Sequence, residues 1–412
     1  MTRRAAFRVA PTLAAVLVAA MAVGAEPQTA ATPHAFADAR SRAVGYEGPG
    51  REDPAPTDVT EVRLGYFGPS DPNHPEGGDF WRGASLAVEE TNAEGGYEGH
   101  PFRLVTGWSD SPWRAGVVRV TEMVFQEHVW AIVGSIDGAT SHLAEQVVAK
   151  AFVTLVSPGS TDKTVNMANV PWMFSCLPSD AAQAPVVGRA LLAASGGDFV
   201  LASGTDHDSR AAVKELAEWL SRESANPRLR LELGGDEPSL TDVTARIAEA
   251  HPAAILVVAE ARSAARLVSA LRAARYRGRI IGGATLGRES FRREGGADDD
   301  GVVFPLLYEP GARWDAFAER FTGRFGQPPD YAAGQAYDSV RLLAAAVREA
   351  GLNRARIRDA VRGLSPWSGV TGILDWDALG QNRRAVTLGT IRHGRVVPIP
   401  VPLEGQLALE PK

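Results

Sequence analysis

The chain has 412 residues, with 43 lysines and arginines against 49 aspartates and glutamates, a formal net charge of −6. This acidic balance argues against nucleic acid and anionic membrane surfaces as partners. Cys176 is the single cysteine, so no internal disulfide forms and a large core must stabilise the fold, which a chain of this length supplies over two domains.

The first 25 residues have the pattern of a secretory signal peptide. Three arginines precede an apolar stretch from Leu13 to Val23, and small residues follow up to Ala25. The stretch is shorter than the roughly 20 residues of a membrane-spanning helix, so we expect cleavage and a soluble product in the periplasm. Residues 26–58 are rich in Ala, Pro and Gly without apolar periodicity, which predicts a flexible leader.

Strands and helices alternate after the leader. The first series is predicted as strand 62–67, helix 79–93, strand 102–106, helix 113–128, strand 130–134, helix 139–151 and strand 152–157. After a loop over 158–180, the second series is predicted as helix 181–195, strand 199–203, helix 209–222, strand 229–233, helix 239–250, strand 253–259, helix 262–276 and strand 279–283. Helices 313–325 and 334–350 and short β segments near 372–376, 386–391 and 395–399 end the chain.

Two such series predict an α/β fold with two doubly wound parallel-sheet lobes joined by a multi-strand hinge. The predicted domains are a signal peptide (1–25), a leader (26–58), an N-terminal lobe (59–177 plus 306–369), a C-terminal lobe (178–305 plus 370–403) and a tail (404–412). Open α/β sheets bind ligands at the carboxyl ends of their strands. We therefore expect function in the loops after Phe67, Gly134, Ser157, Ser203, Ala259 and Gly283.

Motifs for common cofactors and catalytic centres are missing from the sequence. There is no G-x-G-x-x-G, G-x-x-x-x-G-K-[ST], H-E-x-x-H or G-x-S-x-G. The eight histidines are scattered, without a helical pair and a third ligand nearby. Cys176 lies in the apolar run WMFSCL, which favours a buried thiol over a nucleophile. We expect no cofactor, no metal and no enzymatic activity.

Four segments in order resemble the type I periplasmic solute-binding proteins of ABC importers, in particular the leucine/isoleucine/valine-binding group. These segments are LGYFGP (64–69) with GDFWRGASLAVEETNAEGG (78–96), IVGSIDGAT (132–140), LVSPGST (155–161) and YAAGQAYDSVRLLAAAV (331–347). The resemblance spans about residues 60–400. It implies that a small molecule binds between two lobes that close on it, and that a membrane permease and an ATPase are the partners of a monomeric receptor.

The resemblance also implies where the ligand binds. In that family the loops after the third and fourth strands hold the ligand's carboxylate, and Gly159 and Thr161, with Ser160 between them, fall on the backbone and hydroxyl donors. The same three residues would also suit an ordinary helix cap. The predicted ligand-binding residues are Asp137, Ala139, Thr140, Gly159, Ser160, Thr161, Asp208, Glu260, Thr285 and Trp81.

Several of these positions depart from the family's pattern. Asp137 stands where the family has a serine that helps to hold the carboxylate, and Ala284 or Thr285 stands in place of the acid that pairs with the ligand's ammonium group. A carboxylate beside a bound carboxylate is repulsive, so an ordinary branched-chain amino acid is not expected. Further acidic residues near the cleft suit hydroxyl, amine or cationic groups, although each alone also fits a solvated loop: Glu76, Asp208 and Glu260.

Three tryptophans and one further family resemblance indicate what kind of ligand to expect. Trp81, Trp108 and Trp113 lie near the same loops and fit either a stacking wall or ordinary core packing. The segment STDKTVNMANVPWMFSC (160–176) resembles a subgroup found beside quinone-dependent alcohol oxidation systems, which implies an alcohol or a derived acid as ligand.

We expect the substrate-binding component of an importer. One alternative is a periplasmic sensor that passes a ligand signal to a signalling or alcohol-oxidation system. A less favoured alternative is a secreted hydrolase in which Asp137 and Glu260 act as an acid/base pair.

Overall fold

The computed structural model describes residues 45–109, 111–167, 170–234 and 237–400. The predicted signal peptide, most of the predicted leader and the predicted tail lie outside these residues. Among the helices that are described, none is both long and apolar enough to cross a lipid bilayer.

The N-terminal lobe is built on a five-stranded parallel sheet of order β2-β1-β3-β4-β5. Its central strands are continuous apolar runs that are buried along their whole length, as expected for a parallel sheet covered on both faces. The strands are β1 (Val62–Phe67), β2 (Phe102–Gly107), β3 (Ala131–Gly134), β4 (Thr154–Ser157) and β5 (Met173–Ser175).

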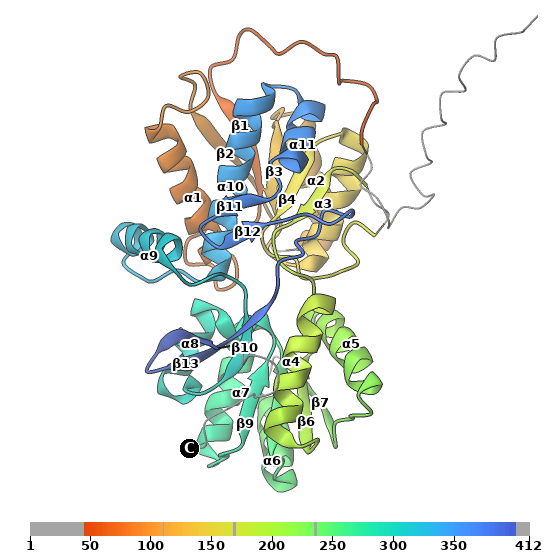
Figure 1. The fold of residues 1–412 in the computed structure, drawn as a ribbon, viewed down its shortest axis with the longest axis vertical. Coiled ribbons are helices and arrows are strands. Elements are labelled where there is room, and N and C mark those ends of the chain that lie inside the picture. The colour runs from red at the N-terminus through yellow and green to blue at the C-terminus, as the bar shows by residue number, and fades with distance from the viewer. Residues whose placement is uncertain (1–44, 110, 168–169, 235–236, 401–412) are drawn as a thin grey trace, which may run out of the picture.

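Helices cover both faces of this sheet. The core on one face joins the sheet to helices from the start and from the end of the chain, which lie side by side in Figure 1: α1 (Gly78–Ala93), α9 (Ala312–Phe325), α10 (Tyr331–Ala350) and α11 (Arg354–Gly363). The other face is covered by α2 (Pro112–Phe125) and α3 (Gly138–Ala151). A short antiparallel hairpin, β11 (Trp367–Gly369) with β12 (Gly372–Leu374), completes the lobe, and the predicted domain boundary after residue 369 falls in its turn.

The C-terminal lobe has a seven-stranded sheet of order β14-β13-β10-β9-β8-β6-β7. Five strands pair in parallel, and β13 and β14 join them through antiparallel pairing. The strands are β6 (Phe199–Gly204), β7 (Arg230–Leu233), β8 (Ala254–Val258), β9 (Arg279–Gly282), β10 (Val303–Leu306), β13 (Thr387–Arg392) and β14 (Arg395–Ile399). One face packs on α4 (Asp180–Ser195) and α5 (His207–Arg222). The other packs on α6 (Glu237–Ala250), α7 (Ala261–Ala273), the 3-10 turn η1 (Ala284–Gly287) and α8 (Glu289–Gly295), beside the short turn η2 (Gly296–Asp299).

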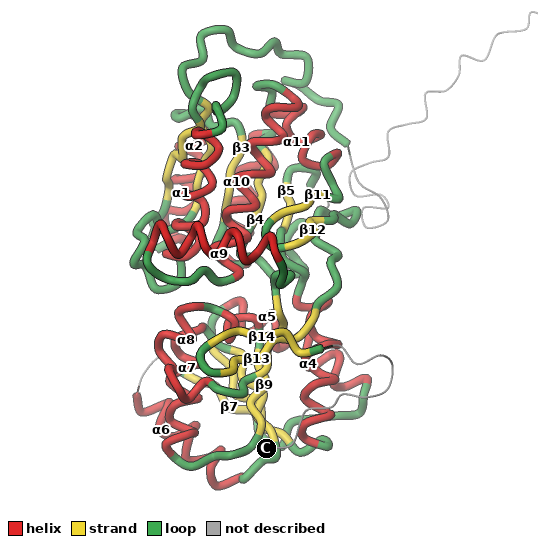
Figure 2. The backbone as a smooth tube through the Cα atoms, turned by 60° about the vertical axis from the view of Figure 1, so that its left-hand side comes forward, coloured by secondary structure: helices red, strands yellow, loops and turns green. Residues whose placement is uncertain are grey.

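The chain crosses between the lobes three times, after β5, after β10 and before β13, and Figures 1 and 2 show the two lobes stacked along the long axis of the molecule. Two of the crossing segments are bonded to each other, because the Asn382 amide donates to the Cys176 carbonyl over 2.7 Å. This confirms the predicted α/β fold with two parallel-sheet lobes.

Five strands and helices were not predicted from the sequence, among them the short strand β11. Strand β5 lies inside the predicted loop 158–180 and is three residues long. Strand β10 contains Pro305, a residue that sheet interiors usually exclude. Helices α8 and α11 are short and rich in arginine.

Candidate functional site

A cavity of about 400 Å³ lies between the lobes. The N-terminal lobe contributes the residues that follow β3 and β4, and the C-terminal lobe contributes those that follow β6, β8 and β9. These are carboxyl ends of parallel strands, where open α/β sheets bind ligands.

Seven of the ten predicted ligand-binding residues line this cavity: Asp137, Ala139, Gly159, Thr161, Asp208, Glu260 and Thr285. Glu76 lines it as well. The other three predicted residues lie elsewhere, and their contacts show why.

Thr140 is buried beneath the cavity wall, at 2% exposure. Its hydroxyl is used inside the lobe, bonded to the Asp137 carboxylate and to Ser135 Oγ at 2.6 Å. Asp137 is the N-cap of α3 and accepts from the Thr140 backbone N–H over 2.7 Å. Burial raises the pKa of Asp137, although the bonds from Thr140 oppose that rise.

The loop from Gly159 to Thr161 is closely packed. A Cβ atom at Gly159 would lie 2.3 Å from the Ile136 carbonyl, so only glycine fits. Ser160 is 1% exposed, and its Oγ has no hydrogen-bond partner among the described residues. The Thr161 carbonyl accepts from the Asp180 N–H over 2.7 Å at the start of α4.

The three tryptophans near the cleft have different environments. Trp81 packs edge-on against Tyr66, with ring centroids 5.1 Å apart, at the border of the N-terminal core. Trp108 packs against Phe67. Trp113 is 66% exposed and lines the cavity, so of the three it is the one placed to contact a ligand.

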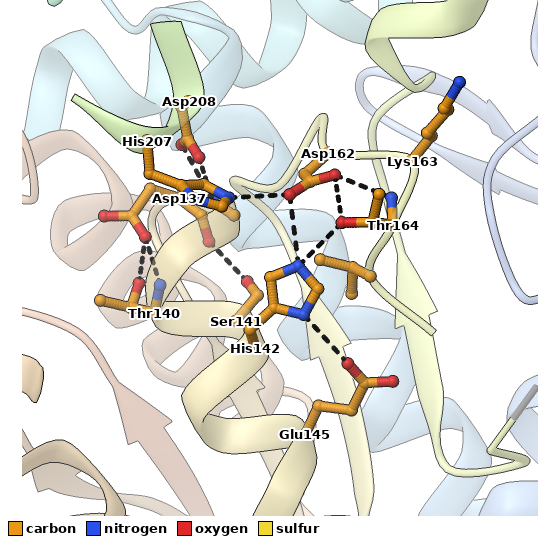
Figure 3. Close-up of polar contacts among 12 residues, drawn as sticks. Asp137, Thr140, Ser141, His142, Glu145, Asp162, Lys163, Thr164, His207 and Asp208 are labelled. Atoms are coloured by element: carbon orange, nitrogen blue, oxygen red, sulfur yellow. Dashed lines mark hydrogen bonds and ion pairs between the residues drawn. The ribbon is translucent and has the colours of Figure 1, made fainter. Parts of the chain in front are cut away.

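Asp208 joins the two lobes inside the cavity (Figure 3). The Gly138 N–H, at the start of α3 in the N-terminal lobe, lies 2.9 and 3.1 Å from its two carboxylate oxygens. Burial, and after it the nearby Asp137, raises the pKa of Asp208 to about 7. A carboxylate of the protein therefore occupies the backbone donor that begins α3.

Arg288 is a cavity residue that the sequence analysis missed. It follows η1 in the C-terminal lobe, is 5% exposed, and donates to Asp330 Oδ2 over 2.7 Å and to the Glu76 carbonyl over 2.8 Å, both in the N-terminal lobe. Burial lowers the pKa of Arg288, but the nearby Asp330, Tyr331, Glu76 and Asp79 raise it, and the net result is a pKa above the usual value. The only signal for it was its position three residues after Thr285, in the segment that follows the predicted strand 279–283.

The cavity wall is rich in carboxyl groups. Besides Asp137 and Asp208 it carries Asp180, Asp206 and Glu260. Burial raises the pKa of Glu260, and it raises the pKa of Asp180 well above the ordinary value. A carboxyl group accepts hydrogen bonds in either protonation state and donates one when it is protonated, so this wall offers bonds to hydroxyl and amine groups.

Cys176 lies away from the cavity and is fully buried. Its Sγ contacts Ser339 Oγ at 3.2 Å, and burial raises its pKa to about 12. The predicted buried thiol is confirmed.

Comparisons with known proteins agree with this architecture. A family model described as periplasmic binding protein matches residues 61–395. A curated amino acid binding protein of Pseudomonas aeruginosa is 30% identical over 131 residues, which are 32% of this chain and 35% of that protein, so the match spans about a third of the relative's length.

Solved structures share the fold at low identity. The substrate-binding protein LivJ of a branched-chain amino acid transporter from Streptococcus pneumoniae, in complex with isoleucine, has a TM-score of 0.74 at 22% identity, over 82% of this chain and 100% of that one. A solute-binding protein of an ABC transporter from R. palustris, in complex with benzoate, has a TM-score of 0.74 at 17% identity, over 82% and 95% of the two chains.

Proposed function

The chain belongs to the periplasmic binding protein family, and from that premise we propose that it is the substrate-binding component of an ABC-type importer. It binds a small organic solute between its lobes, and the closed form is presented to a membrane permease and its ATPase. Closure follows from binding because a ligand that contacts both lobes stabilises the closed arrangement over the open one.

The ligand we propose is a solute with hydroxyl or amine groups, and not an ordinary branched-chain amino acid. The observation that carries this proposal is the bond between Asp208 and the Gly138 N–H. A ligand carboxylate at that donor would have to displace the Asp208 side chain, which already accepts from the Gly138 N–H, and would also lie near Asp137.

The one arginine of the cavity wall does not reverse this preference. Arg288 is already bonded to Asp330. The remaining wall is acidic, uncharged polar or apolar apart from His207, with Phe80, Ile136 and Val258 among the apolar side chains. An apolar pocket with a few convergent polar groups suits a small organic molecule. The link to alcohol oxidation rests on segment 160–176 and is part of this proposal.

A thermal-shift panel tests the function. We expect one or more alcohols, polyols or amines to raise Tm by several degrees, since a ligand at 100 times its Kd stabilises by about 2.7 kcal/mol. Leucine, isoleucine and benzoate are expected to give no shift. A shift with leucine alone would overturn the proposed ligand class, and no shift with any solute would count against the importer.

Two matched variants connect binding to the cavity. Asp208→Asn removes a cavity charge and is expected to weaken binding of an amine at least tenfold, about 1.4 kcal/mol. Glu218→Gln removes an exposed charge from the same helix, α5, and is expected to leave the affinity unchanged. Equal affinities for both variants would place the ligand elsewhere.

A further inference from the structure

A second group of polar side chains lies at the lobe boundary next to the cavity (Figure 3). His142 is on α3, Asp162 is in the loop after β4, and His207 is the first residue of α5. Two of them come from the N-terminal lobe and His207 from the C-terminal lobe. Both imidazoles contact the same carboxylate oxygen. Nε2 of His142 lies 3.2 Å from Asp162 Oδ2, and Nε2 of His207 lies 2.9 Å from it.

Neighbouring groups fix this arrangement. The Thr164 N–H and its hydroxyl both donate to Asp162 Oδ1 over 2.7 Å, which leaves Oδ2 for the imidazoles. The same Thr164 hydroxyl oxygen lies 3.0 Å from His142 Nε2. On the far side of the His142 ring, Nδ1 lies 3.4 Å from Glu145 Oε2. A carboxylate behind a histidine fixes the ring's orientation and directs its other nitrogen outward, as behind metal-ligating histidines.

We propose that His142, Asp162 and His207 form a site for a divalent transition metal, best suited to Zn²⁺, that bridges the two lobes. Their three ligand atoms lie within 4.8 Å of one another. Two ligands on a tetrahedral zinc ion, each about 2.0–2.1 Å from it, are roughly 3.3 Å apart, close to the two distances to Asp162. Imidazole and carboxylate are donors that zinc accepts.

The surroundings fit a site with an open coordination position. The Asp162 side chain is 4% exposed, whereas that of His207 is 43% exposed, so solvent reaches the outer side of the cluster. The nearest lysine, Lys163, is held by Glu215 at 2.7 Å. Arg210 and Lys214 line the same surface hollow, as do Asp180 and Glu215. Two imidazoles and one carboxylate offer too few oxygen ligands for a hard cation such as Ca²⁺.

A bridging ion would act on the lobes' arrangement. An open form separates His207 from the other two ligands, so the ion binds the closed form better and shifts the population toward it. His142 and Asp162 are outside the lining of the cavity, whereas His207 belongs to it. The ion and the solute would therefore occupy neighbouring positions, and each would favour the closed form.

Metal binding by untagged, chelator-treated protein tests the site. We expect Zn²⁺ titrated in a calorimeter to bind at one ion per chain, and Co²⁺ to give the visible spectrum of a tetrahedral N/O complex. His142→Ala is expected to weaken binding at least tenfold, as is His207→Gln, which keeps a hydrogen-bond donor for Asp162 but removes the imidazole ligand. The control is His251→Asn, a change at an exposed histidine with positive φ, and it is expected to bind like the unmodified chain.

X-ray scattering tests the bridging role. Zn²⁺ without solute is expected to reduce the radius of gyration of the unmodified chain and not that of His207→Gln. Absence of stoichiometric binding, or equal binding by His207→Gln and the unmodified chain, would overturn the proposal. Repeating the solute panel in EDTA separates the two proposals, because solute binding without metal leaves the proposed function intact whatever the zinc result.

Discussion

The buried carboxylates of this protein differ in how many hydrogen bonds they accept. Asp338 is fully buried and accepts from the Val370 N–H, the Thr371 N–H and the Thr371 hydroxyl over 2.6–2.9 Å. Asp299 is 1% exposed, and neither of its oxygens has a hydrogen-bond partner among the described residues. Burial raises the pKa of Asp299 to about 6, and it raises the pKa of Asp338 to about 6 as well, although the bonds from Val370 and Thr371 oppose that rise.

Asp299→Asn is therefore expected to stabilise the protein. The folded pKa lies above the unfolded value of about 3.9, so the acid costs no stability below pH 4, an increasing amount up to about pH 6, and a constant amount above that. At pH 7 the variant should gain about 2 kcal/mol and lose this part of the pH dependence. Urea unfolding at pH 4 and pH 7 measures both, with the exposed neighbour Asp298→Asn as control; a larger gain at pH 4 than at pH 7 would contradict the argument.

The order of the predicted strands and loops was enough to predict which acidic side chains lie at the cleft. It predicted that Asp137, Asp208 and Glu260 would face one cleft, and all three line the cavity. It missed Arg288 and the meeting of His142 with His207, since those contacts join residues 42 or more positions apart that no local pattern relates. It also assigned Thr140 to the site, but the side chain of that residue turns inward to Ser135.

At the scale of elements, close helix contact holds the N-terminal lobe together. Helices α1 and α10 lie far apart in sequence, yet they pack so closely that a Cβ atom at Gly83 would lie 2.0 Å from the Ala333 carbonyl oxygen. A methyl group there must push the helices apart.

Gly83→Ala is expected to lower the free energy of unfolding by about 1–3 kcal/mol, the usual cost of overpacking. Gly323→Ala is the control, since Gly323 is exposed on α9 with nothing within 4 Å of an added Cβ, and alanine there should stabilise by about 0.5–1 kcal/mol. Chemical denaturation of both variants checks the pair. Similar values for the two would show that α1 and α10 adjust without cost.

The alternation of strands and helices was predictable because the apolar residues of each long element recur with the period of a strand or of a helix. The predicted strands and helices up to residue 283 are present. Strands β5 and β10 were not predictable, because their β conformation depends on pairing with β4, β9 and β13 more than on their three or four residues.

At the scale of the whole molecule, contacts across the cleft connect the two lobes. Asp208 bonds to Gly138, Lys163 pairs with Glu215, and Arg288 pairs with Asp330. Of these, the pair of Arg288 and Asp330 is the most deeply buried, at 6% and 0% side-chain exposure.

Arg288→Gln is expected to lower the free energy of unfolding by about 3 kcal/mol, because Asp330 stays buried without its charge partner. The lobes should also separate, which scattering would record as a larger radius of gyration. Arg262→Gln removes an exposed arginine 3.7 Å from Glu294 and should change stability by no more than about 0.5 kcal/mol. An unchanged radius for Arg288→Gln would mean that the other contacts suffice for closure.

The burial of Cys176 makes this molecule convenient for distance measurements. Its thiol is protonated at neutral pH and screened from solvent, so reagents that attack thiolates will not modify it. A pair of cysteines introduced on the surface, one on each lobe, would then carry fluorescent dyes at those positions without competition. Energy transfer between the dyes would follow opening and closing in single molecules as solute or zinc is added.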